Sequence, residues 1–179
     1  MKIPIRVQRF LVLRLVLSMV MVAIPATASG QEEPQALTIL AVNLTAQEDE
    51  RPLDPASGQP PSRPGDVIEY RLQFTNPTAG ILQDVVFDDP IPQGLVYLPG
   101  TASAEGDGVA VEFSIDGGAS YSPDPQVEVE EGGRTLRRPA PADLYTHVRW
   151  TVQRPIAVGE GVGATFRARI TGGFANDLE

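Results

Sequence analysis

The sequence contains no cysteine, and its only lysine is Lys2. Without cysteine the chain can form neither a disulfide nor a thiolate metal site. Without lysine beyond position 2, the rest of the chain cannot carry Schiff-base chemistry, a lysine–asparagine cross-link or a phosphate-binding Walker loop. The folded part must therefore be stabilised by core packing, alone or together with a bound ion.

Histidine is almost as scarce, because His147 is the only one. A serine–histidine pair would have to include it, and a zinc site would need mostly carboxylates around it. His147 alternates with Val148 and Trp150, which predicts that its side chain points outward while Trp150 points into a core. These features favour a non-enzyme. A carbohydrate-active enzyme with two catalytic carboxylates remains the alternative, because spacing alone selects no pair.

The one long apolar run lies near the start, at residues 15–24. It follows a basic segment without acids and precedes the small-residue pattern Ala26-Thr27-Ala28. We interpret residues 1–30 as a secretory signal peptide. A membrane anchor is the competing interpretation, but the run is about half of the roughly 20 residues that a spanning helix needs. We therefore expect no transmembrane anchor in the mature chain.

Removal of residues 1–30 makes the remaining chain strongly acidic. It leaves ten arginines against 23 acidic residues, a formal charge of −13. Such a surface repels phosphate groups, which argues against nucleic acid and anionic membranes as partners.

Glycine and proline are abundant, with 17 of each, and both weaken helices. Between residues 67 and 75, Ile68, Tyr70, Leu72 and Phe74 alternate with polar residues, the period of a strand with one buried face. Shorter alternations recur downstream between turn residues, at 111–115, 148–152 and 162–170. We predict a single all-β domain over residues 31–179, an immunoglobulin-like two-sheet sandwich of about seven strands without helices. Residues 47–65, with five prolines, are predicted to form a surface loop.

Two segments carry a recognisable pattern. Residues 65–77 read GDVIEYRLQFTNP and residues 85–97 read VVFDDPIPQGLVY. The combination resembles the bacterial "conserved repeat domain", catalogued as domain of unknown function eleven. The resemblance is close over residues 65–103 and loose over 150–170. It implies an immunoglobulin-like fold on exported bacterial surface proteins, often in tandem copies, with no catalytic residues. Relative to the family pattern, residues 106–141 are expected to be an insertion.

Several residues within this pattern have structural explanations. Gly94, like Gly65, suits a turn conformation, and Asn76 together with Pro77 should end the strand that begins at residue 67. Tyr70 and Tyr97 can bury their rings while the hydroxyl finds a partner. Asp89 is expected to accept backbone N–H groups in a turn before Pro90.

Two local motifs suggest ligands. Residues 114–121, SIDGGASY, resemble the Asp-box of sialidase-like propellers, which stabilises a hairpin. We predict a self-bonded turn there, with a carbohydrate-binding edge as the alternative. Asp84, Asp88 and Asp89 offer the oxygen ligands that calcium prefers, but they lack calcium-loop spacing. Turn capping is the preferred interpretation and a calcium-dependent adhesin the alternative. No other cofactor is expected.

Arginines suggest a binding surface on this acidic domain. Arg149 is in the outward phase of its strand, and Arg167 and Arg169 are in the outward phase of the last strand. If these strands are neighbours, the three side chains form a basic patch that can bind carboxylates. The competing interpretation is cross-strand pairing with Asp84 or nearby glutamates. The segment 128–138, three glutamates followed by three arginines, is expected to be a solvated hairpin or loop.

The sequence therefore predicts an exported, non-enzymatic structural or binding module of the bacterial cell envelope or surface. Its location would be periplasmic, cell-surface or extracellular. The expected partner is an envelope protein or a polysaccharide.

The signal-peptide interpretation predicts where the exported protein begins. Cleavage after Ala28 or Gly30 should leave Ser29 or Gln31 as the first residue. N-terminal sequencing of protein recovered from outside the cytoplasm checks this prediction. An exported chain that still begins at Met1 would contradict it.

Overall fold

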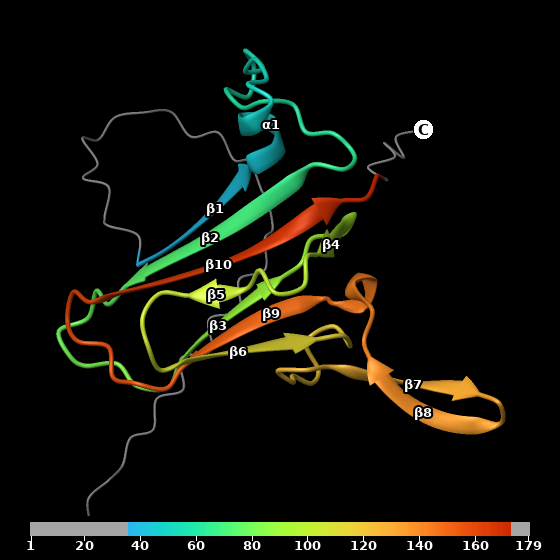
Figure 1. Ribbon diagram of the computed structural model, residues 1–179. Helices are drawn as coiled ribbons and strands as arrows, with labels where there is room; N and C mark the ends of the chain where they lie inside the picture. The colour runs from blue at the N-terminus through green and yellow to red at the C-terminus, as the bar shows by residue number, and fades with distance from the viewer. Residues whose placement is uncertain (1–35, 173–179) are drawn as a thin grey trace, which may run out of the picture.

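The computed structural model describes residues 36–172, which form a sandwich of two antiparallel sheets (Figure 1). The first sheet has the order β1–β2–β10–β4, and β5 also pairs with β10. Its strands are β1 (Leu37–Asn43), β2 (Val67–Thr75), β4 (Leu95–Tyr97), β5 (Ser103–Ala104) and β10 (Gly161–Ile170).

The second sheet has the order β3–β9–β6. Its strands are β3 (Val85–Pro90), β6 (Val109–Ser114) and β9 (His147–Val152). The remaining strands, β7 (Gln126–Glu131) and β8 (Arg134–Pro139), pair with each other and join neither sheet. In Figure 1 this hairpin projects away from the sandwich.

Aromatic contacts show which strands face each other across the sandwich. β2 lies over β3, β10 over β9 and β4 over β6. The contacts are Phe74–Phe87, Trp150–Phe166 and Tyr97–Phe113, with ring centroids 5.3, 6.1 and 5.1 Å apart. The first sheet is wider than the second, so β1 overhangs it without a strand opposite.

Trp150 is at the centre of the core. Its side chain is fully buried, and the indole N–H donates to the carbonyl oxygen of Ser103 at 3.1 Å. Phe166 contacts Trp150 and also stacks on Tyr70, with centroids 4.8 Å apart. The alternation in the sequence thus assigned these side chains to the correct side of their strands.

The prediction of an all-β, immunoglobulin-like sandwich is confirmed. The expectation of no helix is wrong, because β1 runs directly into the short helix α1 (Leu44–Glu48), and a 3₁₀ turn, η1 (Ala142–Leu144), precedes β9. The side chain of Asn43 caps α1 by accepting the N–H of Ala46 at 2.9 Å. Ala46 is buried, so one turn of helix covers this end of the first sheet.

The larger excursions of the chain leave the sandwich at one end, which we call the α1 end. The register places Asn43 beside Ile68 and Leu95 beside Ile170 at this end. Residues 91–94 connect the end of β3 to the start of β4, so β3 also ends here. Helix α1, the loop at 49–66, the turn at 115–122 and the β7–β8 hairpin all depart from here. The range 106–141, expected to be an insertion, also contains β6, which is an integral strand of the second sheet.

Asn76 closes the opposite end of the sandwich. Its amide nitrogen donates to the carbonyl oxygens of Gly80, Ile156 and Ala157, and its Oδ1 accepts from Thr78. The side chain is almost completely buried. These bonds account for Asn76 as a structural residue.

The predicted signal peptide lies outside the described residues. Among residues 36–172, the helices are too short to cross a lipid bilayer.

The position of Trp150 predicts a large loss of stability when it is removed. Trp150→Ala should lower the free energy of unfolding by roughly 3–5 kcal/mol, because it leaves a cavity between the sheets and an unpaired Ser103 carbonyl. Urea unfolding at fixed pH measures the change. Leu136→Ala, at an exposed position of the hairpin, is the control and should change it little. A Trp150→Ala protein as stable as the wild type would contradict the assignment of this core.

Candidate interaction sites

The predicted basic patch does not form. It required the last two strands to be neighbours, but β9 pairs with β3 and β6 while β10 pairs with β2, β4 and β5. Arg149 therefore lies on the outer face of the second sheet, and Arg167 and Arg169 lie on the outer face of the first. Alternation indicated correctly that all three point outward, but it does not say which sheet a strand joins.

Arg149 is paired across strands, with Asp88 instead of Asp84. Its Nη2 donates to Asp88 Oδ2 at 2.9 Å. Its guanidinium carbon lies 3.3 Å from the centroid of the Tyr121 ring, a cation–π contact. The hydroxyl of Tyr121 donates to the same carboxylate at 2.7 Å. Asp88, Tyr121 and Arg149 thus form a closed group, which we call the Asp88 cluster.

The Asp88 cluster contains side chains of the kinds that hydrolases use, but they are not activated. Burial, followed by the hydrogen bond to Asp88, raises the pKa of Tyr121 to about 12. A phenol that remains protonated at neutral pH is a hydrogen-bond donor and a poor nucleophile. His147 contacts the Tyr121 ring edge-to-face, and its Nδ1 lies 3.1 Å from the hydroxyl of Thr146. A hydroxyl, and not a carboxylate, therefore orients the imidazole.

The segment that resembles an Asp-box forms the predicted self-bonded turn. Asp116 accepts hydrogen bonds from the hydroxyl and the backbone N–H of Ser120, at 2.5 and 2.9 Å. These bonds hold the pKa of Asp116 well below its usual range. Gly118 has a positive φ, and a Cβ there would lie 3.0 Å from the Tyr121 hydroxyl. The turn therefore needs glycine where it brings Tyr121 against Arg149.

Arg167 is also paired within the molecule. Arg167 and Arg71 donate to Glu69 at 2.8 and 2.7 Å. Burial alone would raise the pKa of Glu69, but the two guanidinium groups hold it below its usual value. Arg169 is exposed. Cross-strand pairing therefore explains two of the three arginines.

The three calcium candidates do not converge. Asp88 and Asp89 are consecutive residues of β3, so their side chains point to opposite faces of the sheet. Asp84 is exposed in the loop before β3. Among residues 36–172, no three carboxylate or imidazole groups are arranged to hold a metal ion. Asp84, Asp88 and Asp89 therefore do not form the alternative calcium site.

The predicted turn cap at Asp89 is also wrong. Asp89 pairs with Val148 inside β3, and its side chain points into the sandwich with 8% exposure. Within the described part of the chain, its Oδ2 has no hydrogen-bond partner. Burial, and then the charge of Asp88, raises the pKa of Asp89 to about 6. Burial raises the pKa of Tyr70 as well, with a contribution from the charge of Asp89.

The contacts of Tyr97 and Gly94 show that both residues support the fold. The Tyr97 ring is almost fully buried, and its hydroxyl accepts the N–H of Ala102 at 3.3 Å. Gly94 adopts a φ of 84° in the turn before β4. Its carbonyl oxygen accepts the backbone N–H and the hydroxyl of Thr171, each at 3.0 Å.

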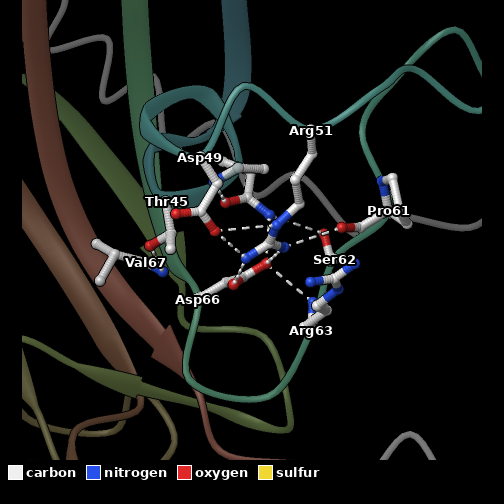
Figure 2. Close-up of polar contacts among 10 residues, drawn as sticks. Thr45, Asp49, Arg51, Pro61, Ser62, Arg63, Asp66 and Val67 are labelled. Atoms are coloured by element: carbon white, nitrogen blue, oxygen red, sulfur yellow. Dashed lines mark hydrogen bonds and ion pairs between the residues drawn. The ribbon is translucent and has the colours of Figure 1, made fainter.

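An ion pair between Arg51 and Asp66 fastens the proline-rich loop (Figure 2). Arg51 donates to both carboxylate oxygens of Asp66, at 2.6 and 2.8 Å, and to the carbonyl oxygen of Pro61 at 3.2 Å. Asn43 donates to the same carboxylate at 2.8 Å. The hydrogen bonds from Arg51 hold the pKa of Asp66 far below its usual range, against the effect of burial. The side chains of Arg51 and Asp66 are 8% and 3% exposed.

Sequence reasoning assigned no role to this pair. Asp66 is the second residue of the pattern GDVIEY, immediately before β2. A carboxylate at the start of a strand is a signal for Asp66, but the proline-rich loop contains both Arg51 and Arg63, so the sequence does not say which arginine pairs with it. The loop of residues 49–66 is thus bonded at its base to the first sheet.

The fastened loop forms one wall of a groove of about 540 Å³. Ile68, Tyr70 and Ile170 of the first sheet line its floor, and Leu53 and Pro60 of the loop line its wall. Residues 40–43 of β1 and Leu95 also line it, together with the polar residues Gln47, Gln59 and Ser62, and the lining contains no charged side chain. The groove is therefore an uncharged and largely apolar site on an acidic domain.

Comparisons with known proteins add little to this geometry. No protein-family model matches the chain, and no curated protein sequence matches it. Among solved structures, the pilus backbone (RrgB) from Streptococcus pneumoniae is similar, with 14% sequence identity and a TM-score of 0.34. The match covers 75% of this chain and 45% of that one, so the chain spans less than half of its length. A likeness of this degree says nothing about function.

The buried carboxyl of Asp89 predicts an unusual pH dependence. Its pKa is raised from the ordinary 3.8 to about 6, so protonated Asp89 stabilises the fold below about pH 4, and this contribution is lost as the pH rises through 6. Ionised Asp89 should cost roughly 3 kcal/mol at neutral pH. Relative to the wild type, Asp89→Asn should gain stability between pH 4 and pH 7.5.

Urea unfolding of wild type and variant at both pH values measures this difference. A buried amide also needs hydrogen-bond partners, so Asp89→Asn can change stability at every pH. The informative quantity is therefore how the stability difference between variant and wild type changes with pH. Asp84→Asn, at an exposed carboxylate, is the matched control and should show no such change. Equal pH dependence of wild type and Asp89→Asn would show that Asp89 does not titrate in this range.

Proposed function

We propose that the chain is a non-enzymatic structural and binding module, exported to the bacterial cell envelope or surface, that contacts a partner there. Export is supported by the basic and apolar start of the sequence and by the resemblance to the conserved repeat domain. A role without catalysis is supported by the Asp88 cluster, in which Tyr121 is held protonated, and by the neighbouring His147, which is oriented by a hydroxyl.

The observation that carries the proposal is the hairpin of residues 126–139, which we call the β7–β8 arm. The register places Val129 opposite Leu136, with Val127 on the same face two residues away. None of these three side chains belongs to the core of the sandwich, and Leu136 is 39% exposed. Val127 and Val129 are half-buried, so the arm has one apolar face, and Leu136 is its exposed member.

An arm of this kind is poorly stabilised by itself. A two-stranded hairpin is at best marginally stable in water, because it cannot bury an apolar face. Cross-strand pairs on the arm are exposed, as for Arg137 with Glu128 at 3.4 Å, and contribute little. A partner that covers the apolar face would remove this surface from water and stabilise the arm.

The chemistry of the apolar face favours a protein partner over a polysaccharide. Arg138 lies opposite Val127 and Arg134 opposite Glu131. Arg138 also donates to Glu131 at 2.7 Å, so charged side chains border the apolar residues of the arm. Apolar side chains flanked by arginine are typical of protein–protein interfaces. We therefore propose an envelope protein as the partner of this arm.

Removal of the arm should abolish partner binding without unfolding the sandwich. Replacement of residues 126–139 by a short glycine–serine linker leaves every core side chain in place, so the melting temperature should change little. Capture from envelope extract of the producing bacterium, followed by mass spectrometry, should recover a partner with the wild-type domain and lose it with the variant.

Matched double variants separate the two faces of the arm. Val129→Thr with Leu136→Thr changes the apolar face, and Gln126→Thr with Thr135→Ser changes the polar face. The first pair should weaken capture and the second should not. Equal recovery of the same protein by the armless domain would overturn the proposal.

A further inference from the structure

β1 is an edge strand without the usual protection of edges. Among residues 36–172 it pairs with β2 alone, in a continuous register from Leu37 to Asn43 without a bulge. Natural edge strands usually carry charges, proline or bulges, which prevent pairing with other chains. β1 reads LTILAVN and has none of these. Its outer edge is therefore a row of backbone donors and acceptors suited to another strand.

The side chains of β1 are exposed because the first sheet overhangs the second. Ile39 lies opposite Leu72 on the inner face of the first sheet, but no strand of the second sheet lies below it, and it is 37% exposed. Leu40 points to the other face and is 50% exposed. An added strand at this edge would cover apolar surface on both faces.

The groove lies beside the same edge. Residues 40–43 of β1 line it together with Ile68 and Tyr70 of β2. Because alternate side chains of a strand point to the same face, a strand added to β1 would direct every second side chain toward the groove. The edge and the groove thus form one continuous surface.

Charge around this surface indicates what kind of strand fits. The groove lining carries no charge, but the exposed acids Glu48 and Glu50 follow directly at the α1 end, and Asp49 between them is paired with Arg51. The mature chain as a whole has a formal charge of −13. An acidic strand would be repelled, and basic residues at the end of a strand that lies toward α1 would be attracted.

We propose that the outer edge of β1 and the adjoining groove bind an extended segment of a partner protein by strand addition. The segment has apolar side chains at alternate positions and basic residues at the end that lies toward α1. Backbone hydrogen bonds to β1 supply affinity, and the uncharged groove selects the side chains. This site goes beyond the proposed function, because it lies on the first sheet and involves no residue of the β7–β8 arm.

A defined peptide tests the proposal. The probe is the labelled peptide KKTVTITVTKK, titrated with the full mature domain and followed by fluorescence anisotropy. It should bind with a dissociation constant on the order of 10 μM. A peptide with proline in place of the central isoleucine cannot complete the ladder and should not bind. A peptide with glutamate in place of lysine should bind at least tenfold more weakly, and salt should reduce that difference.

Variants locate the binding site. Ile39→Lys places a charge on the overhanging face and should weaken binding at least tenfold, as should Leu53→Glu in the groove wall. Val158→Lys is the matched control, because Val158 is an exposed apolar residue at the opposite end, and it should have no effect. Hydrogen exchange at the amides of β1 should slow when the peptide binds.

Several outcomes would overturn the proposal. These are absence of binding at millimolar peptide, equal binding of the proline peptide, or equal binding to Ile39→Lys. Concentration-dependent dimers that Ile39→Lys dissociates would assign the edge to a second copy instead. The armless domain should still bind the peptide, and Ile39→Lys should still capture the partner of the arm, so failure of one proposal is distinguishable from failure of the other.

Discussion

The packing of Trp150 and Phe166 between the sheets is the interaction on which the rest of this domain depends. The two sheets share no strand pairing in the described part of the chain, and without cysteine no covalent link can join them. Side-chain packing must therefore hold them face to face. Phe166 contacts Trp150 on one side and stacks on Tyr70 on the other. Through these rings the second sheet supports β10 and β2, and the overhanging β1 is in turn supported by β2.

At the α1 end, an ion pair determines the position of the loop of residues 49–66. Two buried charges such as Arg51 and Asp66 gain little net stability, because their desolvation offsets much of their attraction. Their geometry, however, permits few arrangements of the loop. Asp66 also accepts from Asn43 and from the backbone N–H of Arg63 at 2.9 Å. The pair thus defines where the loop lies, and the shape of the groove beside β1 follows from it.

Local patterns in the sequence predicted local structure well. Alternation identified β2 and the inward phase of Trp150, and the spacing of serine, aspartate and glycine at 114–121 identified the self-bonded turn. Asp89 was misassigned because aspartate before proline usually marks a turn. β3 is an edge strand of its sheet, where proline is tolerated, so the strand continues to Pro90.

Properties that depend on long-range pairing could not be derived in this way. Similar alternation in β9 and β10 gives no information on which sheet each strand joins. The prediction of a basic patch was wrong for that reason. Arg51 and Asp66 are separated by a proline-rich stretch without periodicity. The groove arises only when that loop is fastened over an overhanging sheet edge, so no residue pattern in the sequence predicts it.

The direction in which the chain enters and leaves the sandwich has a mechanical consequence. Ala36 lies beside Thr75 at the end opposite α1, and Thr171 lies beside Gly94 at the α1 end. Tension along the chain would therefore pull β1 and β10 in opposite directions, parallel to their own axes. Both strands pair with β2 along nearly their full length. The load would act on many of these hydrogen bonds at once, in shear, and would not open them one at a time.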